Sequence, residues 1–122
     1  MMEYRFIKSI NFVGSSREDL RSFPEKVRYD IGFALFLAQK GSKAGSAKPM
    51  KGFGGASILE IIEDSRSGTY RAVYTVRFEK AVYVLHCFHK KSKQGIKTPQ
   101  SDIELIERRL KAAEADYKTH YQ

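Results

Sequence analysis

The sequence predicts an α+β domain in which a small antiparallel sheet carries N-terminal helices on one face and is followed by a C-terminal helix. The main observation is a pair of runs rich in Val, Tyr and Phe, 70–78 and 81–89, which only two residues separate, as in a β-hairpin. The other observations are two stretches with helical apolar spacing, one on either side of this hairpin. The expected order is β-α-α-β-β-β-α, within a single domain over residues 1–122.

A strand and a short helix are predicted at the beginning of the chain. Residues 5–13 alternate loosely between apolar and polar side chains and end at Gly14, which indicates the first strand. Ser15 is followed three residues later by Glu18, the spacing of a capping box. A short helix is therefore expected over about residues 16–21.

A longer helix is predicted to begin at Pro24, whose missing N–H suits a first helical turn, and to end near Lys40. Apolar residues recur at every third or fourth position along it, at Val27, Ile31, Leu35 and Ala38. The aromatic residues Tyr29, Phe33 and Phe36 flank them. Apolar stripes of this kind usually belong to the core, so we expect the aromatic residues to pack on the sheet as well.

The next segment, 41–55, is rich in glycine, has no acidic residue and contains Lys43, Lys48 and Lys51, so we expect a loop. A solvated connection is the simpler interpretation, although such a loop could also hold a backbone phosphate. Residues 57–63 then alternate like a strand and complete a three-stranded meander with the hairpin.

The last helix is predicted from Pro99 together with the capping-box spacing of Ser101 and Glu104. Its apolar residues also step by three and four, at Ile103, Ile106, Leu110, Ala113 and Tyr117. This pattern predicts an amphipathic helix with a solvated, charged outer face.

Side-chain alternation along the first hairpin strand separates its tyrosines from its arginines. Tyr70 and Tyr74 share the expected core face, and Arg71 and Arg77 share the other, which we expect to be free. The second strand leads into the basic run of Lys90, Lys91 and Lys93. A guanidinium can bind two phosphate oxygens at once, so the hairpin is a candidate cradle for a polyanion.

Composition supports an anionic partner. The chain of 122 residues has 22 Lys and Arg against 14 Asp and Glu, a formal net charge of +8. This excess favours nucleic acid, an acidic protein or an anionic surface. The single cysteine, Cys87, cannot form an internal disulfide, and no apolar run is long enough to span a bilayer, so a reducing cytoplasm is expected.

Several catalytic classes are disfavoured by spacing. His86 and His89 are an odd number of residues apart and point to opposite faces of a strand, which argues against a metal site. Cys87 is expected to be a small core residue. His89, beside the lysines, is better placed than His86 to meet a substrate, although an ordinary sheet histidine is the simpler interpretation. Carboxylate pairs of glycosidase type and a nucleophile elbow are absent from the sequence.

Metal-free RNA cleavage is one activity that this set of cations could support. Attack of the 2′-OH on the adjacent phosphate needs a base, a charge stabiliser and an acid. Arg71 suits the second task, and crowded lysines could transfer protons. Glu60 could transfer a proton or form an ion pair with Arg71 or Arg77. Simple phosphate binding stays as the alternative.

Five short motifs together resemble a known group of proteins. They are Ala-Lys-Pro-Met-Lys-Gly-Phe-Gly at 47–54, Leu-Glu-Ile at 59–61, Tyr-Arg-Ala-Val-Tyr at 70–74, Val-Leu-His-Cys-Phe-His-Lys-Lys-Ser-Lys at 84–93 and Thr-Pro at 98–99. In this order they resemble the RelE/ParE toxin superfamily, and within it the phage-derived Gp49-like, HigB-type branch. The resemblance implies a RelE-like fold and the toxin of a type II toxin–antitoxin system.

The resemblance also implies an activity and its residues. The toxin would be a metal-independent endoribonuclease, without a cofactor, that cleaves mRNA on the translating ribosome. Arg71 would stabilise the phosphate in the transition state, and Lys90, Lys91 and Lys93 would orient RNA and share proton transfer. Some members have lysines on the preceding strand where this chain has Glu60 and Ile62. Glu60, His89 or a trailing lysine is therefore the expected base.

The remaining implied roles concern binding. The candidate RNA contacts are Arg77, Lys48, Lys51 and Lys97, with Tyr70 and Tyr74 as candidates for base stacking. The implied partners are mRNA, the ribosome and a cognate antitoxin of the helix-turn-helix HigA type, and no membrane. Two alternatives stay open: a ParE-like toxin that poisons DNA gyrase without nuclease activity, and an inactive RNA-binding relic.

Overall fold

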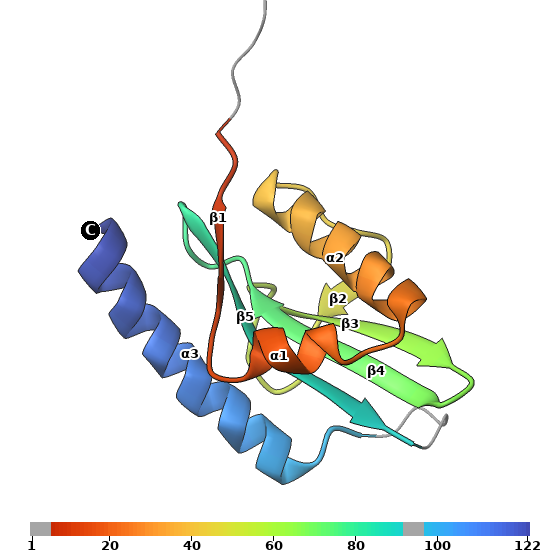
Figure 1. Cartoon of the computed structure of the whole chain (residues 1–122). Helices are drawn as coiled ribbons and strands as arrows, with labels where there is room; N and C mark the ends of the chain where they lie inside the picture. Colours follow the sequence, from red (N-terminus) through yellow and green to blue (C-terminus); the bar gives the residue numbers. More distant parts are fainter. Residues whose placement is uncertain (1–5, 92–96) are drawn as a thin grey trace, which may run out of the picture.

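The computed structural model describes residues 6–91 and 97–122 and has α+β architecture, which confirms the predicted fold class (Figure 1). One sheet has the strand order β1-β5-β4-β3-β2. The elements in chain order are β1 (Ser9–Phe12), α1 (Ser16–Arg21), α2 (Glu25–Gln39), β2 (Ala47–Pro49), β3 (Ile58–Ser65), β4 (Gly68–Thr75), β5 (Ala81–Lys90) and α3 (Gln100–Tyr121). The short β2 lies inside the segment that was expected to be a loop, so the predicted order lacked one strand.

The central strands β3, β4 and β5 form the expected antiparallel meander. At the edges, β1 pairs with β5 in parallel and β2 pairs with β3. The β4–β5 connection is longer than the predicted two-residue turn, because β4 ends at Thr75. Beyond it the chain turns toward the start of β3, where the backbone N–H of Val76 and the Thr75 hydroxyl both donate to the carbonyl of Ser57.

Helices cover both faces of the sheet, so the expectation of a free arginine face on β4 is wrong. Every residue of β4 is buried. One core cluster joins α2 to the face that carries Tyr70 and Tyr74, and a second cluster joins α3 to the opposite face, which carries Val73. In Figure 1, α2 and α3 lie on different sides of the sheet. The face that carries Arg71 is therefore a packed interface with α3.

A β-bulge changes the side-chain alternation in β5. Tyr74 pairs with Val84, whereas Val73, the residue before it, pairs with His86, so Leu85 is an extra residue on β5. Leu85 belongs to the core cluster beside α3, and His86 points to the same side, where it contacts α3. Without the bulge, strict alternation from Val84 would turn His86 toward α2.

The core face of α2 agrees with the prediction, but its aromatic residues do not. Val27, Ile31, Leu35 and Ala38 are buried, as expected. Tyr29, Phe33 and Phe36 are 72%, 53% and 44% exposed, so their predicted packing on the sheet is wrong. The reason is helical geometry: at 3.6 residues per turn these three positions lie together on the side of α2 that faces away from the sheet.

Helix starts differ from the predicted capping boxes. The Ser15 hydroxyl donates to Asp19 Oδ2, at 2.8 Å, instead of capping a backbone N–H. Pro24 and Pro99 are themselves the N-cap residues of α2 and α3, without a side-chain cap, so the expected box of Ser101 and Glu104 does not form. Within residues 6–91 and 97–122, α3 and the other helices are too short or too polar to cross a membrane.

Candidate active site

A row of aligned residues crosses the α3 side of the sheet from β2 to β5. Strand register pairs Lys48 with Glu60, Glu60 with Val73, and Val73 with His86. Paired residues point to the same face of a sheet, and Val73 belongs to the α3-side core, so the whole row faces α3. Glu60 and His86 thus lie on either side of Val73.

Arg71 occupies the next row on this face. It lies two residues before Val73 on β4 and is only 5% exposed. Its Nη1 atom is 3.6 Å from Glu60 Oε2 and donates a hydrogen bond to the Thr98 hydroxyl at 3.2 Å. Of the two roles predicted for Glu60, an ion pair with Arg71 is therefore present. The carboxylate compensates the buried guanidinium charge and fixes its direction.

Asp102 connects two basic groups of β5. Its Oδ1 atom is 2.8 Å from His86 Nε2, and its Oδ2 atom is 3.4 Å from Lys90 Nζ. Phe88 lies between them on the strand, with its ring stacked on His86 and Lys90 Nζ 5.8 Å from its centroid. Asp102 lies in the first turn of α3, where the helix dipole favours a negative charge.

The ionisation of His86 follows from these surroundings. Burial lowers the pKa of His86 and outweighs Asp102, whose hydrogen bond and charge raise it. The imidazole is therefore neutral at pH 7, and its Nε2–H donates to the carboxylate. Its Nδ1 atom is then a buried acceptor, for which the described part of the chain provides no hydrogen-bond partner.

Part of the predicted site is brought together here. Glu60, Arg71 and Lys90 share the α3 side of the sheet, and the exposed Lys48 pairs with Glu60 at its edge. Lys91 follows β5 and is exposed. Lys97 is exposed and precedes Thr98, which contacts Arg71. Lys51 is exposed and lies between β2 and β3. Lys93 lies outside the described residues.

The other predicted residues lie elsewhere. His89 is on the α2 side, stacked on Tyr70 at 4.2 Å between ring centroids, with its Nε2 atom 2.7 Å from the Ser67 carbonyl. Tyr70 and Tyr74 are 5% and 0% exposed and belong to the core cluster on the α2 side of the sheet. Arg77 forms an ion pair with Glu114, with Nη1 2.6 Å from Oε2.

Comparison with known proteins assigns the chain to a family. The family model described as "Phage derived protein Gp49-like (DUF891)" matches residues 18–111. The chain belongs to this Gp49-like family. This confirms the resemblance proposed from the sequence motifs. No curated protein matches the chain.

Solved structures show the fold of the Gp49-like chain. A mutant of the E. coli toxin RelE in the free state is 18% identical, with a TM-score of 0.51 over 88% of this chain and 98% of that one. The isolated E. coli RelE toxin is 20% identical, with a TM-score of 0.51 over 83% and 97%. The toxin–antitoxin complex RelBE2 from Mycobacterium tuberculosis gives 19% identity and a TM-score of 0.44 over 75% and 100%. The two E. coli structures show that this chain has a RelE-like fold.

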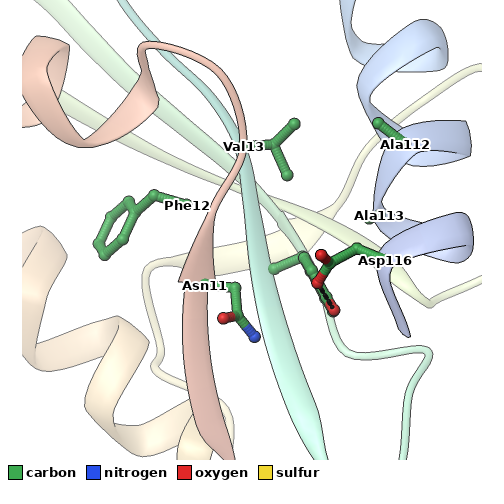
Figure 2. A pocket seen from close by; sticks show the side chains of 7 residues that line it. Asn11, Phe12, Val13, Ala112, Ala113 and Asp116 are labelled. Atoms are coloured by element: carbon green, nitrogen blue, oxygen red, sulfur yellow. Dashed lines mark hydrogen bonds between the residues drawn. The ribbon is translucent and has the colours of Figure 1, made fainter. Parts of the chain in front are cut away.

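A hollow of about 310 Å³ lies outside this cluster in the Gp49-like chain, between β1 and α3. Figure 2 shows Asn11 on β1, and Val13 directly after this strand, facing Ala112 and Asp116 on α3. Asp116 accepts a hydrogen bond from the Tyr83 hydroxyl at 2.6 Å. The hollow is lined by Asn11, Phe12, Val13, Tyr83, Ala112, Ala113 and Asp116, and none of the predicted site residues is among them.

Sequence reasoning missed His86 and Asp102 as members of the site. His86 faces α3 because of the bulge at Leu85, which carries no glycine or other turn residue that would mark it. Asp102 is an acidic residue in a first helical turn, which is ordinary for a helix. Only their contact, which depends on how α3 packs on the sheet, identifies them.

The structure also settles the positions of the sulfur and imidazole groups. Cys87 is 1% exposed, as expected for a core residue, and burial raises the pKa of its thiol to about 12. His86 and His89 point to opposite faces, as predicted. Among the described residues, no three His, Cys, Asp or Glu side chains gather closely enough to hold a metal ion.

Proposed function

We propose that this chain is the toxin of a type II toxin–antitoxin system and acts as a metal-independent endoribonuclease that cleaves mRNA on the translating ribosome. One observation carries the proposal: Arg71 is held by Glu60 at 3.6 Å on the same sheet face as Lys90 and its carboxylate partner Asp102. A directed guanidinium beside proton-transferring groups is what metal-free cleavage of a phosphodiester requires. Membership in the Gp49-like family and the RelE-like fold support it.

The reaction would use the RNA's own nucleophile. The 2′-oxygen attacks the adjacent phosphorus and loses its proton to a base, while the bond to the 5′-oxygen breaks and that oxygen gains a proton. The products are a 2′,3′-cyclic phosphate and a free 5′-hydroxyl, so no water is consumed in this step. Arg71 would bind the non-bridging oxygens, whose negative charge grows in the transition state.

Exposed cations around the cluster would bind the RNA backbone. Lys48, Lys91 and Lys97 are exposed among the described residues, and Lys93 belongs to the same basic run. With a net charge of +8, the chain would bind RNA with a steep dependence on salt. These contacts would position the RNA strand, whereas Arg71, with Glu60 and Lys90 near it, would act on the phosphate.

The proposed partners follow from the same function. A translating ribosome would present the mRNA, so the toxin would act in the cytoplasm. A cognate antitoxin, of the HigA-like helix-turn-helix type, would neutralise it. The RelE-like fold, shared with the E. coli toxin RelE, supports such a pairing.

Cleavage of a defined mRNA by the purified protein, with and without translating ribosomes, tests the proposal. Arg71→Lys keeps the charge beside Glu60 but loses the guanidinium fork, so we expect the cleavage rate to fall at least about 10²-fold. Arg77→Lys is the matched control, because Arg77 pairs with Glu114 away from the cluster, and its rate should stay near wild type.

Two results would contradict the proposal that the chain is a nuclease. Intact mRNA from a protein that still arrests growth would point to a gyrase poison, which a supercoiling assay would identify. RNA binding without cleavage or growth arrest would indicate an inactive relic. Cleavage that both variants retain would show that the phosphate is not bound at Arg71.

A further inference from the structure

His86 has one ring nitrogen that contacts Asp102 and one for which residues 6–91 and 97–122 offer no hydrogen-bond partner. Its Nε2 atom is 2.8 Å from Asp102 Oδ1, and its side chain is 9% exposed. Its Nδ1 atom is fully shielded, and the described residues provide it with no hydrogen-bond partner. Buried polar atoms are nearly always paired, so an exception of this kind is a candidate position for a bound group.

The contact with Asp102 fixes which nitrogen can accept a proton. A carboxylate that accepts from Nε2–H holds the ring in one tautomer and leaves the lone pair on Nδ1. The same carboxylate would stabilise the positive ring once Nδ1 has taken up a proton. Burial, which lowers the pKa of His86, keeps the ring neutral and ready to accept one.

The ring is also within reach of the group that Arg71 would bind. His86 pairs with Val73, and Arg71 is two residues from Val73 on the same face, so His86 and Arg71 are diagonal neighbours. The Cα atoms of diagonal neighbours on adjacent strands are about 7–8 Å apart, a gap that long side chains and a bound phosphate can close. On the other side of Val73, Glu60 contacts Arg71 directly.

The other candidate bases are less suitable. The Glu60 carboxylate is already engaged by Arg71, which suits a residue that positions the guanidinium. His89 lies on the opposite face of the sheet, and its Nε2 atom contacts the Ser67 carbonyl. Of the three histidines in the chain, the last, His120, lies near the end of α3 and contacts Asp116 there.

We propose that His86, held by Asp102, is the base that accepts the proton of the RNA 2′-hydroxyl. This inference rests on the proposed function. Nδ1 takes the proton as the 2′-oxygen bonds to phosphorus, and the bond between phosphorus and the 5′-oxygen breaks. The Lys90 ammonium donates a proton to that leaving oxygen. Since Asp102 contacts both His86 and Lys90, the proton gained by one returns to the other through this carboxylate and solvent after product release.

The kinetic test compares pH–rate profiles of single-turnover mRNA cleavage on ribosomes for wild type and His86→Gln. The glutamine amide can still donate to Asp102 but cannot accept the proton. We expect a rate loss of about 10²- to 10⁴-fold, disappearance of the acid limb of the profile, and RNA affinity within about twofold of wild type. His89→Gln, on the same strand but the opposite face, is the control and should keep both rate and profile.

An NMR measurement tests the same arrangement without RNA. In the ¹⁵N-labelled protein at pH 7, the His86 ring should be neutral with its proton on Nε2. A proton on Nδ1, or a charged ring, would overturn the inference. This spectrum on His86→Gln and His89→Gln also shows whether each variant is folded.

The kinetic outcomes separate the two proposals. If His86→Gln cleaves mRNA at the wild-type rate, with an unchanged acid limb of the pH–rate profile, the role of His86 as base would be overturned and the nuclease proposal would stand. A folded wild-type protein that cuts no mRNA at any pH would overturn the nuclease, and the base with it. Loss of cleavage together with loss of RNA affinity would make His86 a binding residue instead.

Discussion

The 2.8 Å contact between His86 Nε2 and Asp102 Oδ1 ties the last strand of the sheet to the first turn of α3. Arg71 donates a hydrogen bond to Thr98, which lies just before α3, so the packing of α3 and the composition of the candidate site depend on each other. A similar dependence holds for Lys90, which reaches the same carboxylate. Changes at this contact should therefore alter both ionisation and stability.

Replacing Asp102 with asparagine should lower the pKa of His86 further. Asp102 raises that pKa through its hydrogen bond and its charge, whereas burial, the larger effect, lowers it. The Asp102→Asn substitution removes the charge and keeps the burial, so the neutral ring is favoured over a wider pH range. An NMR titration of the His86 ring in both proteins checks this. A higher pKa in the variant would contradict the assignment of Asp102 as the raising group.

Stability should fall as the solution is acidified through the range in which unfolded histidine titrates. The folded pKa of His86 lies below its ordinary value, so the unfolded chain takes up a proton first. Its contribution is fully present above a pH of about 6.5 and is lost as the pH drops toward the folded value.

Urea unfolding at pH 7.5 and 5.5 measures this effect. The drop in the free energy of unfolding should be smaller in His86→Gln than in wild type, because glutamine does not titrate. Equal drops in wild type and His86→Gln would contradict the depressed pKa.

Glu60 and Arg71 should be coupled in stability. Both residues are buried, and their charged atoms are 3.6 Å apart. Removing one partner of a buried ion pair costs about 3–5 kcal/mol, because it leaves an uncompensated charge, whereas replacing both with apolar residues costs much less. Glu60→Leu, Arg71→Met and the double variant, compared by denaturant unfolding, form the cycle. Additive single-variant costs would show that the pair is not coupled.

The sequence predicted the secondary-structure elements and their core faces better than it predicted which faces are covered and which are exposed. Hydrophobic periodicity identified the meander and the core face of α2, since burial of Val27, Ile31 and Leu35 follows from helical spacing alone. It could not show that α3 would cover the arginine face of β4, because a long amphipathic helix can dock in several places. The exposure of Phe33 was missed because an aromatic residue is usually buried. Its angular position around α2, which turns it away from the sheet, decides its exposure instead.

The site was predictable only as far as the motifs reached. Arg71, Glu60 and Lys90 were named from residue type and from the motifs that contain them, and the structure places them on one face of the sheet; their roles in catalysis stay predictions. His86 was passed over in favour of His89, which lies beside the lysines in the sequence, and the bulge at Leu85, which turns His86 toward α3, carries no signal there.

The exposed aromatic residues of α2 should matter little for stability. Phe33 is 53% exposed, and Phe33→Ala is expected to change the free energy of unfolding by no more than about 0.5 kcal/mol. Ile31, on the same helix, is 0% exposed, and Ile31→Ala should cost about 2–5 kcal/mol through the cavity it leaves. Denaturant unfolding of both variants checks the prediction. A large loss in Phe33→Ala would mean that this side of α2 is packed after all.

Two glycines should respond to alanine in opposite directions. Gly68 begins β4 with φ of 129°, and a Cβ atom there would clash with the carbonyl oxygen of Lys90. Backbone cannot move aside easily, so Gly68→Ala should destabilise the protein by more than about 1 kcal/mol and displace Lys90 from Asp102. Gly32 lies within α2 and has open space around it, so Gly32→Ala should stabilise by about 0.5–1 kcal/mol. Thermal unfolding of the two variants measures both effects, and a neutral Gly68→Ala would show that the hairpin end is not as closely packed against β5 as the structure indicates.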